Sequence, residues 1–220
     1  MVVEPVFSVQ TYIQLRSITE VSSHFKKQLT SVSLTKSEFF AKLVPLFSSE
    51  RYELGPYSLC LILHHFCVVE DECMVMYGNF SEPSKDTSSN IVPKCWLSTG
   101  EEMEHRYVNN PSSIPPPPST DFFSKFKAIL DKYEIDVIGV CYSPPLLKPE
   151  HRYLETLKED NQLQIINQVL ASSIDLAMTM LVIWTLSLMG EGCDPLLYWA
   201  TICVNCLLLK LIVLVPCHLP

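Results

Sequence analysis

The last quarter of the chain is its most apolar part. Residues 176–190 carry no charge, and after a short acidic break a second apolar run occupies residues 195–217, interrupted only by Lys210. A helix needs about 20 apolar residues to cross the hydrocarbon core of a bilayer. The second run has that length and the first is shorter. We therefore expect residues 161–220 to form a hydrophobic helical region, built as a helical hairpin or a tail anchor.

A polar stripe leads into the first apolar run. Its members are four, four, three and four residues apart: Gln164, Gln168, Ser172, Asp175 and Thr179. Residues with this spacing share one face of a helix. The pattern predicts a long helix that begins near residue 149 and becomes apolar on all sides where the stripe ends.

Charge divides the chain into two parts. Only 18% of the residues are charged, whereas soluble domains average about 25%. Most of the deficit lies in residues 161–220, so the remainder has an ordinary globular composition. The net charge of −8 and the lack of basic clusters exclude nucleic acid as a partner, because phosphate binding requires grouped lysines and arginines.

The beginning of the chain does not predict a secretory signal, because no basic residue precedes an apolar segment there. We therefore expect the folded N-terminal part to lie in the cytosol and to be membrane-associated through the C-terminal region. The sequence does not indicate which organelle. The nine cysteines are irregularly spaced, and in the cytosol we expect them to be reduced thiols.

Local patterns predict several elements in the first half of the chain. Apolar and polar residues alternate over residues 7–15, which predicts a half-buried strand. Thr35 and Glu38 form a capping box, which predicts a helix ending near Leu46. Apolar residues 58–69 and 73–77 flank an acidic turn and predict an antiparallel hairpin. A helix that begins at Pro56 is the alternative for this region.

A proline-rich connector occupies residues 109–120. It contains four consecutive prolines, Pro115, Pro116, Pro117 and Pro118, which impose an extended conformation. Apolar residues at helical spacing follow, and Thr120 or Asp121 is expected to cap that helix. Residues 135–141, which are rich in valine and isoleucine, then predict a buried strand.

These elements define the expected fold class and domains. We expect an α+β or α/β fold with a mixed sheet, followed by the hydrophobic helical region. Residues 1–108 form the first part of the domain, and the connector 109–120 follows. Residues 121–160 contribute a helix–strand unit that completes the domain, and residues 161–220 form the helical region, with 176–190 and 195–217 as its apolar segments.

Cys60, His64 and Cys67 are the candidate metal ligands. On a helix these three positions share one face and could converge on a zinc ion, which cysteine and histidine bind well. On a strand, Cys60 and His64 point to one side and Cys67 to the other. The strand that we expect here argues against the site.

Cys141 is the candidate nucleophile. It ends the predicted strand 135–141, and α/β folds often place functional residues at strand ends. A reactive thiolate needs a base, and His105 and His151 are the nearest candidates in the sequence. No cofactor is predicted, because six glycines leave little room for a glycine-rich phosphate loop.

Three accounts of the C-terminal region are open. In the first, residues 176–217 hold a cytosolic domain at a membrane by contacting lipid or a partner protein. In the second, the protein is soluble and these helices are buried in its core or in an oligomer interface. In the third, the last residues come from an alternative transcript end and complete no domain. We favour the first account.

The function that these patterns favour is a non-enzymatic interaction or adaptor protein, because apolar helices and a proline-rich segment both serve contacts. The four prolines could dock in the groove of an SH3 or WW domain, or serve as a stiff connector. The alternative is a small cysteine-dependent hydrolase or transferase that uses Cys141, with the C-terminal helices buried.

Overall fold

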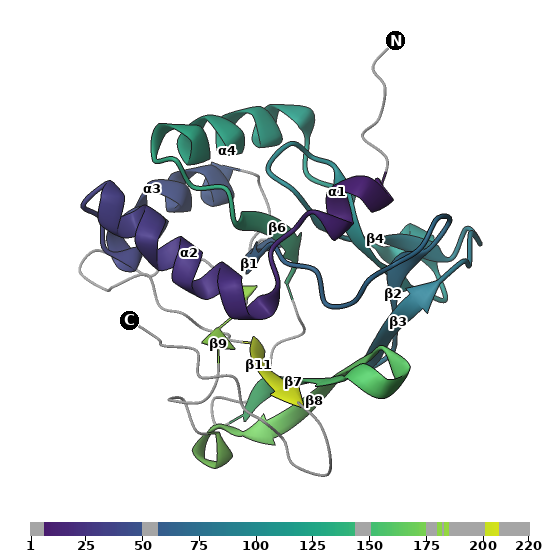
Figure 1. Cartoon of the computed structure of the whole chain (residues 1–220). Helices are drawn as coiled ribbons and strands as arrows, with labels where there is room; N and C mark the ends of the chain where they lie inside the picture. The colour runs from purple at the N-terminus through teal and green to yellow at the C-terminus, as the bar shows by residue number, and fades with distance from the viewer. Residues whose placement is uncertain are drawn as a thin grey trace.

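A curled mixed sheet with helices gathered beside one end forms the fold (Figure 1). The computed structural model describes residues 7–49, 57–143 and 151–174, and beyond them three short strands. These are β9 (Met180–Leu181), β10 (Ile183–Trp184) and β11 (Thr201–Cys206). The expectation of an α+β fold with a mixed sheet is confirmed for the described part of the chain.

The first element is a short helix, α1 (Val9–Ile13), so the predicted strand over residues 7–15 is wrong. The Ser8 side chain accepts a hydrogen bond from the Thr11 backbone N–H at 3.2 Å and closes the first helical turn. The turn places Tyr12 in the core, where it is 1% exposed. An alternation of apolar and polar residues over so few positions fits both a strand and a capped helical turn, so it cannot decide between them.

Two longer helices follow, α2 (Ile18–Ser31) and α3 (Lys36–Ser49). The predicted capping box of α3 is confirmed, because the Thr35 N–H donates to Glu38 Oε2 at 2.7 Å and the Glu38 N–H donates to Thr35 Oγ1 at 3.2 Å. The helix continues through Pro45 to Ser49 rather than ending near Leu46.

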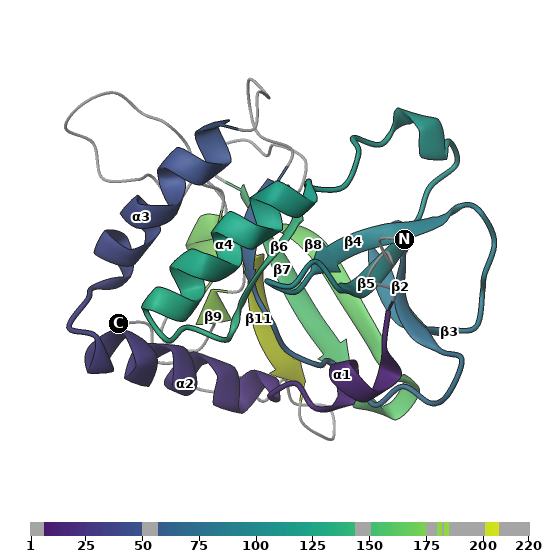
Figure 2. The ribbon, with the colours of Figure 1, turned by 90° about the horizontal axis from the view of Figure 1, so that it is seen from above.

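The helix after the prolines, α4 (Thr120–Lys132), is confirmed, and its cap is one residue earlier than expected. Ser119 Oγ accepts a hydrogen bond from the Phe122 N–H at 3.1 Å. Helices α3 and α4 pack through aromatic rings, with the centroids of Phe47 and Phe122 5.2 Å apart. Figure 2 shows α2, α3 and α4 on the same side of the sheet.

The described sheet contains eight main strands in the order β1-β6-β4-β5-β2-β3-β8-β7, which curl into a half-barrel. All neighbours in this series pair antiparallel except β2 and β5. Short strand β10 pairs with β1 at one edge, and β11 pairs with β7 at the other. The eight strands are β1 (Tyr57–Leu61), β2 (Cys73–Tyr77), β3 (Phe80–Ser84), β4 (Ile91–Trp96), β5 (Glu102–Tyr107), β6 (Ile138–Tyr142), β7 (His151–Lys158) and β8 (Leu163–Leu170).

The two strands of the predicted hairpin exist, but they do not pair with each other. β1 pairs with β6, whereas β2 lies between β5 and β3. The connection between them is too long for a tight hairpin turn. It also buries its own apolar side chains in the core, namely Ile62, Leu63, Phe66 and Val68. The predicted strand at 135–141 is confirmed as β6.

The long helix predicted from residue 149 is wrong over the described residues 151–170. This region is a β-hairpin in which β7 pairs with β8 along eight residues, from His151 opposite Leu170 to Lys158 opposite Leu163. A spacing of four fits a strand as well as a helix, because four is a multiple of the strand period of two. Gln164 is 1% exposed and faces the protein interior rather than solvent.

Most of residues 176–190 and 195–217 lies outside the described residues, and there the helical hairpin stays a prediction. Where these segments are described, at β9, β10 and β11, the chain forms short strands rather than a helix. Within the described part of the chain, no helix is both long and apolar enough to span a bilayer. The connector between β5 and α4 contains a short 3₁₀ turn (Pro111–Ser113) and is otherwise extended through the prolines.

Candidate functional site

A tight hairpin tip lies over the first turns of α4. The Leu97 N–H donates to the Glu101 carbonyl at 2.8 Å, and the Gly100 N–H donates to the Leu97 carbonyl at 3.0 Å. Gly100 has a φ of +87°, and a Cβ there would lie 3.0 Å from Phe123 Cδ2. Glycine at this position therefore allows both the left-handed turn and its close approach to the Phe123 ring.

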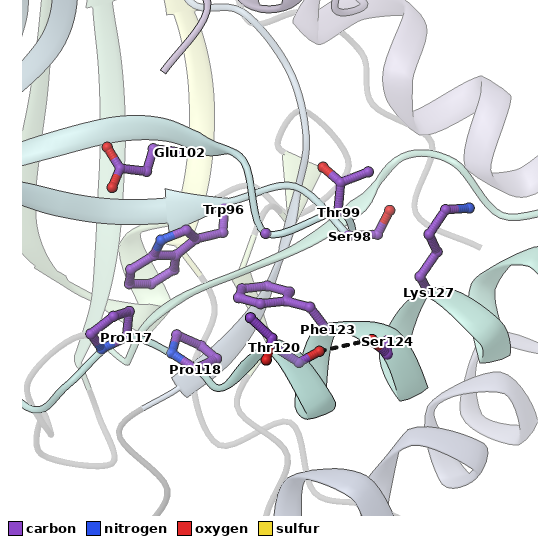
Figure 3. Close-up of a pocket in the computed structure, with 11 residues that line it drawn as sticks. Trp96, Ser98, Thr99, Glu102, Pro117, Pro118, Thr120, Phe123, Ser124 and Lys127 are labelled. Atoms are coloured by element: carbon purple, nitrogen blue, oxygen red, sulfur yellow. Dashed lines mark hydrogen bonds between the residues drawn. The ribbon is translucent and has the colours of Figure 1, made fainter. Parts of the chain in front are cut away.

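A groove of about 510 Å³ lies between this tip, α4 and the prolines, and we call it the α4 groove (Figure 3). The rings of Trp96 and Phe123 face into it, and Trp96 lies over Pro117 and Pro118. Helix α4 contributes residues at helical spacing, which share one face. The lining residues are Trp96, Ser98, Thr99, Gly100, Glu102, Pro117, Pro118, Thr120, Phe123, Ser124 and Lys127.

The proline segment is bound by the protein's own tyrosines. Tyr142 Oη donates to the Pro115 carbonyl at 2.6 Å, and Tyr57 Oη donates to the Pro116 carbonyl. The two tyrosines are directly opposite on β1 and β6, and their rings stack with centroids 5.6 Å apart. The Trp96 ring packs edge-on against Tyr142 at 5.1 Å. These contacts hold one wall of the groove in place.

A second group of functional side chains lies inside the half-barrel, and we call it the interior ion cluster. His65 Nδ1 is 2.9 Å from Glu104 Oε1, and His65 Nε2 is 2.8 Å from Glu155 Oε1. Lys94 Nζ donates to Glu104 Oε2 at 3.1 Å, and Gln164 Nε2 is 3.3 Å from His65 Nε2. The two cations and two anions balance, as buried charges require.

The electrostatics of this cluster favour the charged form of each member. Burial alone would lower the pKa of His65, but the carboxylates of Glu155 and Glu104 outweigh it and raise the pKa to about 10. Burial alone would raise the pKa of Glu104, but Lys94 and His65 hold it well below its usual range. Burial alone would also raise the pKa of Glu155, but His65 and Lys94 outweigh this effect and lower the pKa.

A β-bulge explains how Lys94 reaches the interior. On β4, Pro93 lies opposite His105 and Cys95 lies opposite Glu104, so Lys94 is the extra residue of the ladder. Lys94 and Cys95 are consecutive, yet both line the same small cavity, as Glu104 does. A regular strand would send two consecutive side chains to opposite faces.

Three buried thiols adjoin the ion cluster, and we call them the thiol triad. Cys60 on β1, Cys95 on β4 and Cys141 on β6 have sulfur atoms that all lie within 4.8 Å of one another. The cavity that Lys94 and Glu104 line is also lined by Cys60 and Cys95 and has a volume of about 40 Å³. Hydrogen bonds from Cys60 and Cys95 hold the pKa of Cys141 well below its ordinary value, and the same bonds to Cys141 raise the pKa of Cys60 and of Cys95.

The structure does not gather the three candidate metal ligands. Cys60 lies on β1, in keeping with the expected strand. His64 Nδ1 lies 2.6 Å from the Leu15 carbonyl, and Cys67 is exposed in the loop that follows. Among the described residues, Cys60 is instead grouped with Cys95 and Cys141.

The candidate nucleophile and its two histidines are also on different strands. His105 lies on β5, where burial alone would lower its pKa, but Cys73 and Glu102 raise it to about 9. His105 Nε2 is 3.1 Å from Glu102 Oε2. His151 begins β7, at the far end of the strand order from Cys141 on β6. A hydrolase or transferase that uses Cys141 stays a prediction.

Sequence reasoning missed Cys95, Lys94 and Glu155, and it did not predict that Gln164 of the polar stripe joins His65 and Glu104 in the interior ion cluster. They come from a loop and from four strands, so no local spacing relates them. Comparison of this chain with protein-family models, with curated proteins and with solved structures gave no match.

Proposed function

We propose that this chain is a non-enzymatic interaction protein whose α4 groove binds an extended peptide segment of a partner protein. The lining of the groove carries this proposal. Aromatic rings and prolines form its apolar walls, and the hydroxyls of Ser98, Thr99, Thr120 and Ser124 lie among them. Such a combination suits a peptide, because an apolar side chain can lie on the exposed edge of Pro117 and on the floor formed by the largely buried rings, while hydroxyls satisfy the peptide backbone.

The size and charge of the groove support the same occupant. A volume of about 510 Å³ lies within the range of about 300 to 1,000 Å³ that is typical of ligand sites. Glu102 and Lys127 lie toward opposite ends of the groove (Figure 3). Both side chains already have partners in the chain, since Glu102 pairs with His105 at 3.1 Å and Lys127 pairs with Asp131 at 2.6 Å. We therefore expect a peptide that is mainly apolar and uncharged where it lies in the groove.

The proposal includes a membrane location for this module. Residues 195–217 have the length and apolarity of a spanning helix, and residues 176–190 precede them. A spanning helix there would replace the short strand β11, which pairs with β7. These segments would hold the folded part at the cytosolic face of a membrane. Contacts with lipid or with a partner protein through residues 176–217 remain a part of the proposal outside the α4 groove. Docking of an SH3 or WW domain on the prolines also remains a part of it, and such a domain would compete with the peptide, because Pro117 and Pro118 line the groove.

The peptide proposal can be tested by a substitution that fills the α4 groove and blocks binding there. Ser124 is exposed on α4 and lines the groove, so Ser124→Trp should fill it without disturbing the core. Peptides selected from a displayed random library against the wild-type chain should bind this variant at least about tenfold more weakly, a loss of about 1.4 kcal/mol. Fluorescence anisotropy with the selected peptides would measure the loss.

Lys125→Trp is the matched control, because Lys125 is exposed on the same helix but does not line the groove. This variant should bind the selected peptides as the wild type does. The proposal fails if the library yields no peptide that binds the wild type, or if Ser124→Trp and Lys125→Trp bind with the same affinity.

A further inference from the structure

The thiol triad has the composition and placement of a metal centre, and we infer that Cys60, Cys95 and Cys141 together hold one zinc ion. The three residues lie on the adjacent strands β1, β6 and β4. Cys141 is directly opposite Cys95 on one side and opposite Ser58 on the other. Ser58 and Cys60 are two residues apart on β1, so all three thiols point to one face of the sheet.

The distances between the sulfurs are close to those of a zinc site. Zinc–sulfur bonds of about 2.3 Å in a tetrahedron separate the sulfurs by about 3.8 Å. The three sulfurs lie within 4.8 Å of one another, so closure needs movements of about 1 Å or less at each. Rotation about the Cα–Cβ bonds supplies such movements while the strands stay in place.

The small cavity beside the triad provides room for the fourth ligand. It is lined by Cys60 and Cys95 and by polar groups that include Lys94, Glu104 and Gln164, and its volume of about 40 Å³ exceeds the roughly 15 Å³ that one water needs. A water molecule there would complete the tetrahedron that zinc prefers. Cavity and triad therefore form one three-thiolate site with an open position.

Charge favours zinc over copper(I), the other ion that binds buried thiolates well. Three thiolates and Zn²⁺ carry a net charge of −1, whereas three thiolates and Cu⁺ carry −2. The positive and negative charges of the interior ion cluster beside the triad cancel one another, so the cluster has no spare positive charge to offset the charge of a metal site. The smaller net charge is easier to bury in an interior where Cys60, Cys95 and Cys141 are 5%, 8% and 0% exposed.

Burial also sets how the experiment must be done. Because solvent hardly reaches the triad, the ion would enter as the chain folds, and metal binding would then contribute to folding. The full chain is refolded with excess Zn²⁺ under reducing conditions, freed of unbound metal and analysed for metal content. About one zinc per chain is expected, together with a higher melting temperature than that of protein refolded with a chelator.

Variants locate the ion. Cys95→Ser and Cys141→Ser should each lower the zinc content by at least about tenfold. Cys67→Ser is the matched control for an exposed thiol, and a Cys203→Ser, Cys206→Ser double variant controls for the pair of cysteines at positions 203 and 206. Both controls should keep one zinc. Loss of zinc in either control but not in the triad variants overturns the assignment, as does a wild-type chain that binds only copper(I) or no metal.

Two measurements on the wild-type chain, cobalt absorption and cysteine alkylation, test the proposal even if a triad variant misfolds. Co²⁺ in the wild-type site should show intense thiolate-to-metal absorption in the near ultraviolet. In a denaturant concentration that unfolds the metal-free chain, zinc should protect Cys60, Cys95 and Cys141 from iodoacetamide, and mass spectrometry of the peptides would identify them. Equal alkylation of these three cysteines with and without zinc contradicts the proposal.

Discussion

At the scale of single residues, His65 is held by ionic contacts on both sides. Both ring nitrogens face carboxylates, and the side chain is 9% exposed. The imidazole is therefore held in its charged form between Glu104 and Glu155. Loss of that charge would leave two buried carboxylates opposed by Lys94 alone, an arrangement that buried groups tolerate poorly.

The raised pKa of His65 predicts a specific dependence of stability on pH. A group whose pKa is higher in the folded state stabilises the protein fully below its unfolded pKa of about 6.5, and this contribution is lost as pH rises through the folded value. Folding raises the pKa of His65 to about 10. We expect His65 to contribute a decrease in the free energy of unfolding on the order of 3 kcal/mol between about pH 7 and pH 10.

Denaturant titrations at several pH values would measure this decrease in the wild type and in two variants. His65→Gln should be less stable at pH 7 and should show a shallower decrease, because the titrating group is gone. His64→Gln is the control, since His64 is the adjacent residue and contacts the Leu15 carbonyl. An unchanged slope in His65→Gln would show that His65 is not the titrating group.

At the scale of elements, the contact between β6 and β4 depends on Gly139. A Cβ at this position would lie 2.4 Å from the Trp96 carbonyl oxygen and 2.1 Å from Ile62 Cδ1. The carbonyl belongs to the backbone of the neighbouring strand and cannot rotate away. Glycine thus allows the strands that carry Cys95 and Cys141 to approach each other.

Gly139→Ala should therefore destabilise the fold by about 2 kcal/mol or more, since overpacking forces backbone shifts. The matched control is Gly78→Ala, where a Cβ meets nothing within 4 Å but φ is +66°. That control should lose only about 1 to 2 kcal/mol, the strain of a left-handed alanine. Thermal and denaturant unfolding would compare the two. Equal losses would mean that the close approach at Gly139 is relieved without cost.

At the scale of the whole molecule, the proposed membrane association rests mostly on residues outside the described part of the chain. Carbonate extraction of membranes from cells that express the full chain, or a version ending at Asp175, tests it. The full chain should stay in the pellet, because an apolar run of the length of residues 195–217 is not released by alkaline washing. The shortened chain should be in the supernatant.

Circular dichroism of the shortened chain is the control for its fold. If the full chain is extracted into the supernatant, the membrane part of the proposed function is wrong, and the apolar residues belong to a protein core or an oligomer interface. The α4 groove does not depend on that outcome, since its lining residues all lie between Trp96 and Lys127.

The sequence alone determined those elements whose signals are local. The Thr35–Glu38 capping box, helix α4 and strand β6 were predicted because a cap or a period is complete within about ten residues. The same reasoning failed at β8, where a spacing of four suits both a helix and a strand. It failed at α1, where a single side-chain cap at Ser8 decided the conformation.

Only the tertiary structure decided which strands are neighbours, and with them the sites. Cys60, Cys95 and Cys141 are 35 and 46 positions apart in the sequence, and no pattern relates them. They meet because β1, β6 and β4 are adjacent in the sheet. The curl of the sheet likewise brings Glu155 on β7 to His65 in the loop after β1. Such contacts depend on pairing between distant segments, which burial of the whole core selects and local propensity does not encode.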